Sequence, residues 1–177
     1  MGNISCFFTA YSMKTDIVKQ FEMQYRQLAG GVFRYVYFKV SGYELAQDIT
    51  EETFVRYWKV LTKKKSIDSH KALLYFIAKG LIIDTYRKKS NKKISLETID
   101  ERLLAVQDTM EDTVSQNQEL EQVYANIKKL KKDYQDILFL HFVEDFSIKE
   151  IAYIQKKSEN SLRVLLHRSL KALKEKL

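Results

Sequence analysis

The sequence Phe146-Ser-Ile-Lys-Glu-Ile-Ala-Tyr-Ile-Gln-Lys-Lys-Ser-Glu-Asn-Ser-Leu-Arg-Val-Leu-Leu-His-Arg-Ser-Leu-Lys-Ala-Leu173 predicts two helices joined by a very short turn. Ser147 is a suitable N-cap for the first helix, and Glu150 completes an S-x-x-E capping box with it. Ser158 is a suitable N-cap for the second helix. A short helix that supports a second one with a polar, basic outer face is typical of a DNA-binding helix-turn-helix, although a surface hairpin with a solvated face has the same pattern.

The second of these helices has an apolar face and a polar face. Its apolar stripe repeats at helical spacing and consists of Leu162, Leu165, Leu166, Leu170 and Leu173. The opposite side carries Asn160, Val164, His167 and Lys171, flanked by Arg163 and Arg168. We therefore expect the leucines to pack inward and the polar side to face a partner.

The composition of the whole chain favours helices. The 177 residues include no proline and only 5 glycines. Because proline breaks helix interiors, its absence leaves long helices uninterrupted, and alternating strand patterns are hard to find. We predict an all-α protein with two small helical domains, an N-terminal helical bundle and a C-terminal helix-turn-helix domain.

Charge is distributed in three blocks. Residues 1–93 carry a net charge of +9, residues 94–121 carry −7 and residues 122–177 carry +5. Two basic blocks around an acidic one favour two polyanion-binding domains and a linker that avoids the polyanion, although charge runs are also common on solvated surfaces. The predicted division is a loose arm at 1–15, a helical domain at 16–93, an acidic linker at 94–118 and a second helical domain at 119–177.

The first domain is predicted to contain four helices, at residues 16–28, 32–40, 44–61 and 71–89. Gly30-Gly31 is expected to separate the first two. The fourth is apolar on nearly all sides through Leu81-Ile-Ile83, which predicts the central helix of the bundle. The second domain is predicted to begin with helices at 119–130 and 134–143.

The sequence offers no catalytic constellation. It lacks a Gly-rich phosphate loop and the G-x-S-x-G and H-E-x-x-H patterns, and its 3 histidines are scattered. The single cysteine, Cys6, excludes an internal disulfide and fits a reducing compartment. No stretch is long and apolar enough to span a membrane. We expect a cytoplasmic protein that is not an enzyme and uses no metal or cofactor, starting at Met1 or Met13.

Two further surfaces of the first domain suit binding. Asp48, Glu51 and Glu52 share one helix face, which is typical of a solvated or protein-binding surface. Along the fourth helix, aromatic residues are interleaved with cations. This combination suits unstacked bases, because rings stack on bases and cations hold phosphates, although aromatic residues also form cores. These residues are Tyr75, Phe76, Lys79, Tyr86, Arg87, Lys88 and Lys89, beside the lysine loop Lys63-Lys64-Lys65.

Three stretches, in this order, resemble the extracytoplasmic-function (ECF) group of bacterial RNA polymerase sigma factors, in the sigma-70 family. Ala46-Gln-Asp-Ile-Thr-Glu-Glu-Thr-Phe-Val-Arg-Tyr-Trp58 is similar to the acidic helix that these factors dock on the polymerase clamp. Leu73-Leu-Tyr-Phe-Ile-Ala-Lys-Gly-Leu-Ile-Ile-Asp-Thr-Tyr-Arg87 is similar to their promoter-melting helix, which reads the minus-ten element. Asp133-Tyr-Gln-Asp-Ile-Leu-Phe-Leu-His-Phe-Val143, followed by the helix-turn-helix, is similar to their minus-thirty-five domain.

The resemblance implies a promoter-recognition subunit that works with core RNA polymerase on duplex and melted promoter DNA at the bacterial nucleoid, with an anti-sigma factor as a further partner. It assigns polymerase binding to Asp48, Glu51, Glu52 and Arg56. It assigns the minus-ten element to Lys63, Lys64, Lys65, Tyr75, Lys79, Tyr86, Arg87 and Lys88. It assigns the minus-thirty-five element to Ser158, Asn160, Ser161, Arg163, Val164, His167, Arg168 and Lys171.

The chain departs from the family pattern at several positions. Glu51 stands where the family usually has Gln, and the usual Trp near Leu73 is missing. Gly80 stands where Asn is usual and removes a side chain that could touch DNA, which affects the strand-separation contacts rather than the fold. Lys156 stands where Gly is common between the last two helices, and Leu130-Lys131 replaces the usual Leu-Pro.

Two other functions fit parts of the sequence. A stand-alone helix-turn-helix regulator would bind a palindromic duplex without polymerase, but it leaves the acidic face and the basic fourth helix without a role. A recombinase-like enzyme would need a nucleophile near cations, and Tyr86 beside Arg87 is the one candidate.

Overall fold

The computed structural model describes residues 4–40, 42–63, 66–93 and 125–176. Within these ranges every regular element is a helix, which confirms the predicted all-α class. The chain divides into two compact units, residues 1–92 and residues 93–177.

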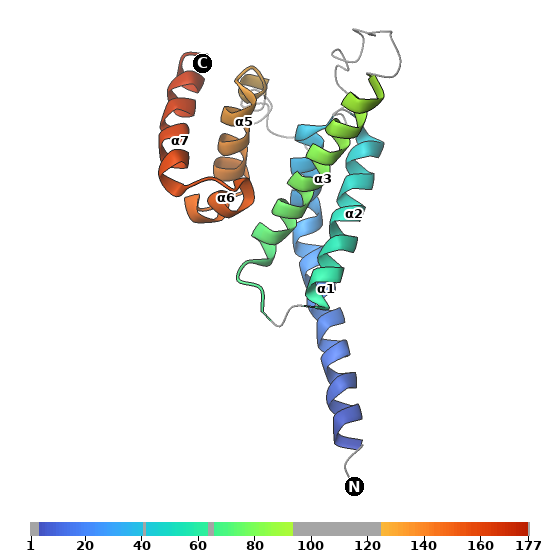
Figure 1. The fold of residues 1–177 in the computed structure, drawn as a ribbon. Coiled ribbons are helices and arrows are strands. Elements are labelled where there is room, and N and C mark those ends of the chain that lie inside the picture. Colours follow the sequence, from blue (N-terminus) through green and yellow to red (C-terminus); the bar gives the residue numbers. More distant parts are fainter. Residues whose placement is uncertain (1–3, 41, 64–65, 94–124, 177) are drawn as a thin grey trace. The chain divides into compact units, whose positions relative to one another are not determined.

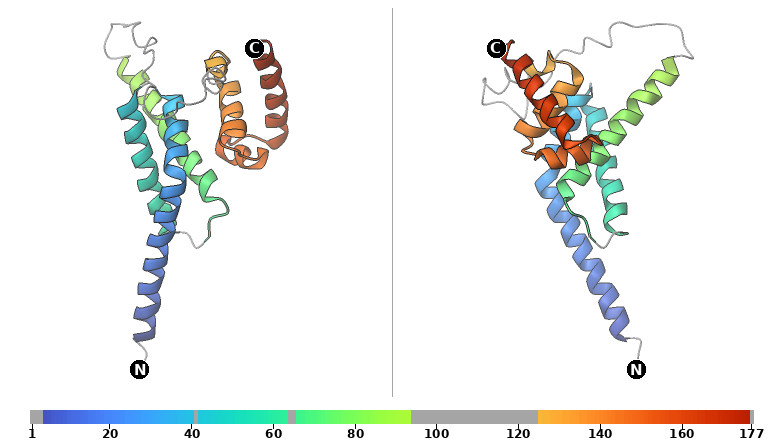
Figure 2. Two further views of the ribbon diagram at one scale, coloured as in Figure 1. Left: turned by 180° about the vertical axis from the view of Figure 1, so that it is seen from behind. Right: turned by 60° about the vertical axis from the view of Figure 1, so that its left-hand side comes forward.

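The described part of the first unit has three helices, α1 (Ile4–Lys39), α2 (Tyr43–Leu61) and α3 (His70–Lys93). α2 runs back along the second half of α1, and α3 packs across them (Figure 1). The first half of α1 extends past the ends of the other two helices (Figure 2). Residues 1–15 were predicted as a loose arm, and from Ile4 onward they belong to this helix.

α1 continues through Gly30-Gly31, where the sequence predicted an interruption. Each glycine costs a helix about 1 kcal/mol relative to alanine. The residues that follow bury Val32, Tyr35 and Val36 almost completely, and burial of one such side chain contributes about 1.5–3 kcal/mol. Tertiary packing therefore outweighs the local preference, and the first two predicted helices are one.

Aromatic rings join α1 to α2. The ring of Phe21 meets that of Trp58 edge-on, with 5.2 Å between centroids. The rings of Tyr25 and Phe54 lie 4.7 Å apart in a similar arrangement. Ring pairs of this kind add to the burial of their apolar area and fix the register of the two helices.

α3 is buried along most of its first half, as expected of a central helix. Ile83 is an exception to its apolar pattern, because its side chain is 54% exposed. The buried residues of α3 are Ala72, Leu73, Leu74, Tyr75, Ala78, Leu81 and Ile82.

In the second unit, residues 125–128 are helical and precede α5 (Lys132–Leu138), the π-helical turn η2 (Phe139–Val143), α6 (Ile148–Gln155) and α7 (Glu159–Lys174). α5 continues directly into η2, so the helix predicted at 134–143 is present and ends in a π-helical turn. α7 packs against both α5 and α6. The core consists mainly of fully buried residues, Ile137, Leu138, Phe139, Leu140, Phe146, Ile151, Ile154 and Leu162.

Candidate nucleic-acid interface

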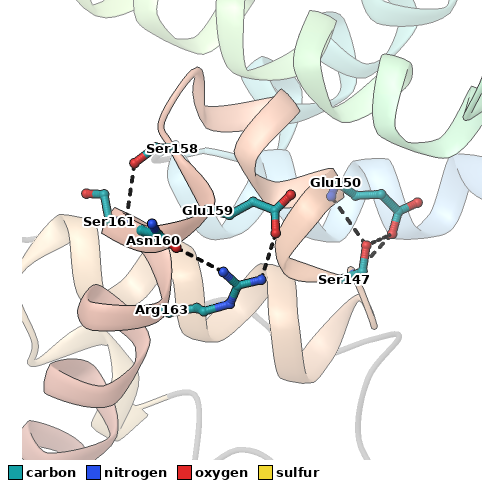
Figure 3. Close-up of polar contacts among 7 residues, drawn as sticks. All are labelled: Ser147, Glu150, Ser158, Glu159, Asn160, Ser161 and Arg163. Carbon is teal, nitrogen blue, oxygen red and sulfur yellow. Dashed lines mark hydrogen bonds and ion pairs between the residues drawn. The ribbon is translucent and has the colours of Figure 1, made fainter.

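The helix-turn-helix forms with the caps that the sequence predicted. The Ser147 hydroxyl accepts from the Glu150 backbone N–H at 3.3 Å, and the Glu150 carboxylate accepts from the Ser147 N–H at 3.1 Å. The Ser158 hydroxyl accepts from the Ser161 N–H at 3.3 Å and caps α7 (Figure 3). These bonds satisfy N–H groups that a helix start leaves free, so they fix where α6 and α7 begin.

The turn between α6 and α7 keeps its geometry without the usual glycine. Lys156 adopts the left-handed conformation, with φ 54° and ψ 42°, at the C-cap of α6. Its backbone N–H bonds the carbonyl of Tyr153 at 3.4 Å, and that of Lys157 bonds the carbonyl of Ala152 at 3.2 Å. A residue with a Cβ is strained in this conformation, so the bonds and packing of the two helices hold the turn.

α7 has one inward and one outward side. Leu162 is fully buried, whereas Leu170, from the predicted stripe, is 42% exposed. The predicted contact residues of this helix are all exposed, and they are Asn160, Ser161, Arg163, Val164, His167, Arg168 and Lys171. The structure therefore gathers the predicted minus-thirty-five residues on the open side of one helix.

Arg163 is held at the start of α7 by two neighbours. Its Nη2 donates to the Glu159 carboxylate at 2.8 Å, and its Nη1 donates to the Asn160 side-chain oxygen at 3.1 Å (Figure 3). The sequence alone did not lead us to predict the contact between Glu159 and Arg163. Their i, i+4 spacing was the signal that could have revealed the pair.

α2 presents its acidic residues on its open face. Asp48 and Glu51 are exposed, and the Glu52 carboxylate accepts from the Arg56 guanidinium at 2.7 Å. That hydrogen bond is the main reason why the pKa of Glu52 lies below its usual value. Val55, 47% exposed, lies within the same face. The four residues predicted to bind polymerase thus form one surface with an apolar centre.

At the end of α3, Tyr86 combines an exposed ring with an anchored hydroxyl. The side chain is 47% exposed, and its hydroxyl donates to the Lys39 carbonyl oxygen at the end of α1, at 2.7 Å. Partial burial raises the pKa of Tyr86. Beside it, Arg87 is exposed and lies 3.5 Å from the Asp84 carboxylate, and Lys88 is exposed as well.

Tyr75 does not belong to this exposed surface. The sequence predicted its ring at the minus-ten element, but the residue is fully buried and its ring lies 5.2 Å from that of Tyr35. Tyr75 occupies the side of α3 that packs on α1, and a ring enclosed there cannot stack on a base. Lys79 is partly buried and Lys63 is exposed, whereas Lys64 and Lys65 lie outside the described residues.

A three-ligand metal site and a membrane-spanning helix are both absent from the described part of the chain. Its residues contain no group of three His, Cys, Asp or Glu side chains arranged to hold a metal ion. None of the helices in the same residues has the length and apolar character needed to cross a bilayer.

Two family models match the two units. Sigma-70 region 2 matches residues 24–92, and sigma-70 region 4 matches residues 120–173. This chain belongs to the sigma-70 family of RNA polymerase sigma factors. The region 2 match covers α2 and all but the last residue of α3, and the region 4 match covers α6 and all but the last residue of α7.

Curated relatives of this sigma factor are of the ECF type, as the sequence predicted. ECF RNA polymerase sigma factor SigX of Bacillus subtilis is 23% identical over 88% of this chain and 82% of its own length. BldN of Streptomyces coelicolor, also an ECF sigma factor, is 27% identical over 84% of this chain, and the match spans 57% of BldN.

Solved structures share the fold. The sigma factor RpoE from Bartonella quintana, solved in complex with the anti-sigma factor NepR, aligns with a TM-score of 0.75 and 15% identity, covering 89% of this chain and 96% of that one. CnrH, solved with the cytosolic domain of CnrY, aligns with a TM-score of 0.63 and 15% identity, covering 89% and 86%.

The region 2 match disfavours the stand-alone regulator, because it gives the first unit a role in the same family as the helix-turn-helix. The recombinase alternative needs Tyr86 as a nucleophile, but the Tyr86 hydroxyl is bound to the Lys39 carbonyl.

Proposed function

We propose that this chain directs core RNA polymerase to promoters through three surfaces. The acidic face of α2 binds the polymerase clamp, the end of α3 with the adjacent lysine loop binds the melted minus-ten element, and the open side of α7 binds the minus-thirty-five element. The observation that carries the proposal is the segregation of charge on exposed helix faces: acids gather on α2 and cations on the end of α3 and on α7.

The two DNA-binding surfaces have a chemistry suited to their targets. The exposed ring of Tyr86 offers a stacking platform, worth about 1–3 kcal/mol per base, to offset the few kcal/mol needed to extrude a base. Arg87 and Lys88 supply charge for the adjacent phosphates. On α7, Arg163 has the fork geometry that recognises guanine, and the exposed Val164 can meet a thymine methyl group.

The predicted division into a domain at 16–93, a linker at 94–118 and a domain at 119–177 is part of this proposal. The two family models leave residues 93–119 between them. The acidic charge of these residues suits the basic RNA-exit path of the polymerase, which binds the phosphates of RNA when RNA is present. Promoter DNA as the target implies action at the nucleoid in a bacterial cytoplasm. An anti-sigma factor is a further expected partner; RpoE, of similar fold, was solved with one.

A binding assay with core RNA polymerase tests the proposal at its first step. The full chain is compared with a variant carrying Asp48→Lys, Glu51→Lys and Glu52→Lys. Because all three side chains lie on the open face of α2, the variant is expected to fold and to bind core polymerase at least tenfold more weakly. Glu22→Lys, an exposed acid on α1, is the matched control and should bind normally. Failure of the unmodified chain to bind core polymerase would reject the proposed function.

A further inference from the structure

The contacts of Arg163 restrict how it can meet DNA. Its Nη2 and Nη1 donate to Glu159 and Asn160. An arginine has five N–H donors, so these two bonds leave three for a ligand. Because Asn160 uses its oxygen for Arg163, its NH₂ group is left to donate elsewhere. Two hydrogen bonds therefore restrain the Arg163 guanidinium, while enough donors remain for a bidentate contact.

The Glu159–Arg163 pair is too exposed to be needed for folding. The two side chains are 41% and 59% exposed. Exposed i, i+4 pairs contribute little to stability, and salt screens them further. A restrained arginine, however, loses less rotamer entropy when it binds a ligand. The pair therefore affects the orientation of Arg163 more than the stability of α7.

We propose that Glu159 is a positioning residue that directs Arg163 toward a base edge and away from the phosphates. The proposal rests on the proposed function, because it places Arg163 in the minus-thirty-five major groove. A free arginine on this surface is attracted to phosphates, which receive half to two-thirds of protein–DNA hydrogen bonds. The Glu159 carboxylate offsets the guanidinium charge locally but leaves planar donors for guanine O6 and N7. With Glu159 beside it, Arg163 thus binds base edges in preference to phosphates.

The test uses holoenzyme made from core polymerase and the full chain. Binding is measured on promoters randomised over the minus-thirty-five element, at several salt concentrations, and Arg163→Ala first identifies the base pair that Arg163 reads. Glu159→Ala is expected to lower discrimination at that base pair about two- to threefold, in line with the small free energy of an exposed pair. It should also steepen the salt dependence by up to about one phosphate contact, because Arg163 then pairs more often with the backbone.

Two further variants separate positioning from a general effect. Glu159→Gln keeps an acceptor for Arg163 and should retain part of the discrimination. Glu159→Ala combined with Arg163→Ala should discriminate no worse than Arg163→Ala alone, because both changes act through one group.

Glu175→Ala is the matched control, since it removes an exposed acid from the other end of α7 and should leave discrimination unchanged. The positioning role is wrong if Glu159→Ala keeps the wild-type discrimination and salt dependence, or if it weakens recognition equally at every position. A wild-type holoenzyme without any minus-thirty-five preference would instead overturn the proposed function.

Discussion

The Tyr57 hydroxyl lies 2.8 Å from Nδ1 of His70, which joins α2 to the first residue of α3. On the other side of the ring, the Gln20 side-chain nitrogen lies 2.9 Å from Nε2, so one histidine links the three helices described in the first unit. Because the Gln20 nitrogen is a donor, Nε2 accepts and the neutral ring carries its proton on Nδ1. A protonated ring would lose the acceptor that Gln20 uses.

This linkage predicts acid sensitivity of the first unit. Burial lowers the pKa of His70 from 6.5, so below that pH the unfolded chain binds a proton that the folded chain excludes. Stability is therefore full above about pH 6.5 and falls as pH decreases toward the folded pKa. The pKa of Glu52 is lowered from 4.5, so this group affects stability only at a more acidic pH than His70 does. Urea midpoints followed by the fluorescence of the single tryptophan, Trp58, should decrease between pH 7 and pH 5.

The His70→Asn variant should be less stable at pH 7 but should show a smaller change between pH 7 and pH 5. His167→Asn removes an exposed histidine of α7 and serves as the matched control. An unchanged pH dependence in His70→Asn would assign the acid sensitivity to other groups.

We expect the Tyr86 hydroxyl to stabilise the fold and the Tyr86 ring to contribute to promoter opening. Tyr86→Phe removes the bond to the Lys39 carbonyl and should lower stability by about 0.5–1.5 kcal/mol, with promoter opening retained. Tyr86→Leu also removes the ring and should reduce open-complex formation at least fivefold, since one stack is worth about 1–3 kcal/mol. Permanganate reactivity of the minus-ten bases measures this, and equal opening by both variants would exclude stacking.

Gly80 weakens α3 without a packing reason. A Cβ at this position meets nothing within 4 Å, and the residue is exposed. Gly80→Ala should therefore stabilise region 2 by about 1 kcal/mol. Gly30→Ala, at an equally open position of α1, should give a similar gain and is the matched control. If Gly80→Asn, the usual family residue, opens promoters no faster than Gly80→Ala, a contact role for this position is ruled out.

Lys156 strains the turn of the helix-turn-helix through its positive φ of 54°. Lys156→Gly relieves the Cβ conflict and should stabilise region 4 by about 1 kcal/mol. Hydrogen exchange of the α6 and α7 amides should slow about fivefold if these amides exchange through unfolding of region 4. Lys157→Gly, at the next position, should give no gain, and a gain there equal to that of Lys156→Gly would contradict the explanation.

The sequence predicted best those structural features that depend only on residues close together in the chain. The Ser147–Glu150 capping box needs only local chemistry, and it formed as expected. The continuity of α1 through Gly30-Gly31 depends on burial of Val32 and Tyr35 against other helices, which no local pattern reveals.

Two tyrosines of α3 also show that a local sequence pattern does not reveal which side chains become buried. Tyr75 and Tyr86 are eleven positions apart and lie close in angle on a helical wheel, yet one is fully buried and the other about half exposed. The difference comes from position along the helix rather than face, because Tyr75 lies against Tyr35 and Tyr86 lies at the level of Lys39, where α1 ends. Only the lengths and packing of both helices decide which ring can reach a base.

Start-site sequencing of transcripts made on a randomised promoter library tests the central claim most directly. Core RNA polymerase supplied with this chain should initiate at templates that share two sequence blocks at fixed distances upstream of the start. The charge-reversed α2 variant should lose this selection, and Glu22→Lys should keep it. Initiation no more selective than that of core polymerase alone would contradict the account, as would strong binding of the free chain to a palindromic duplex.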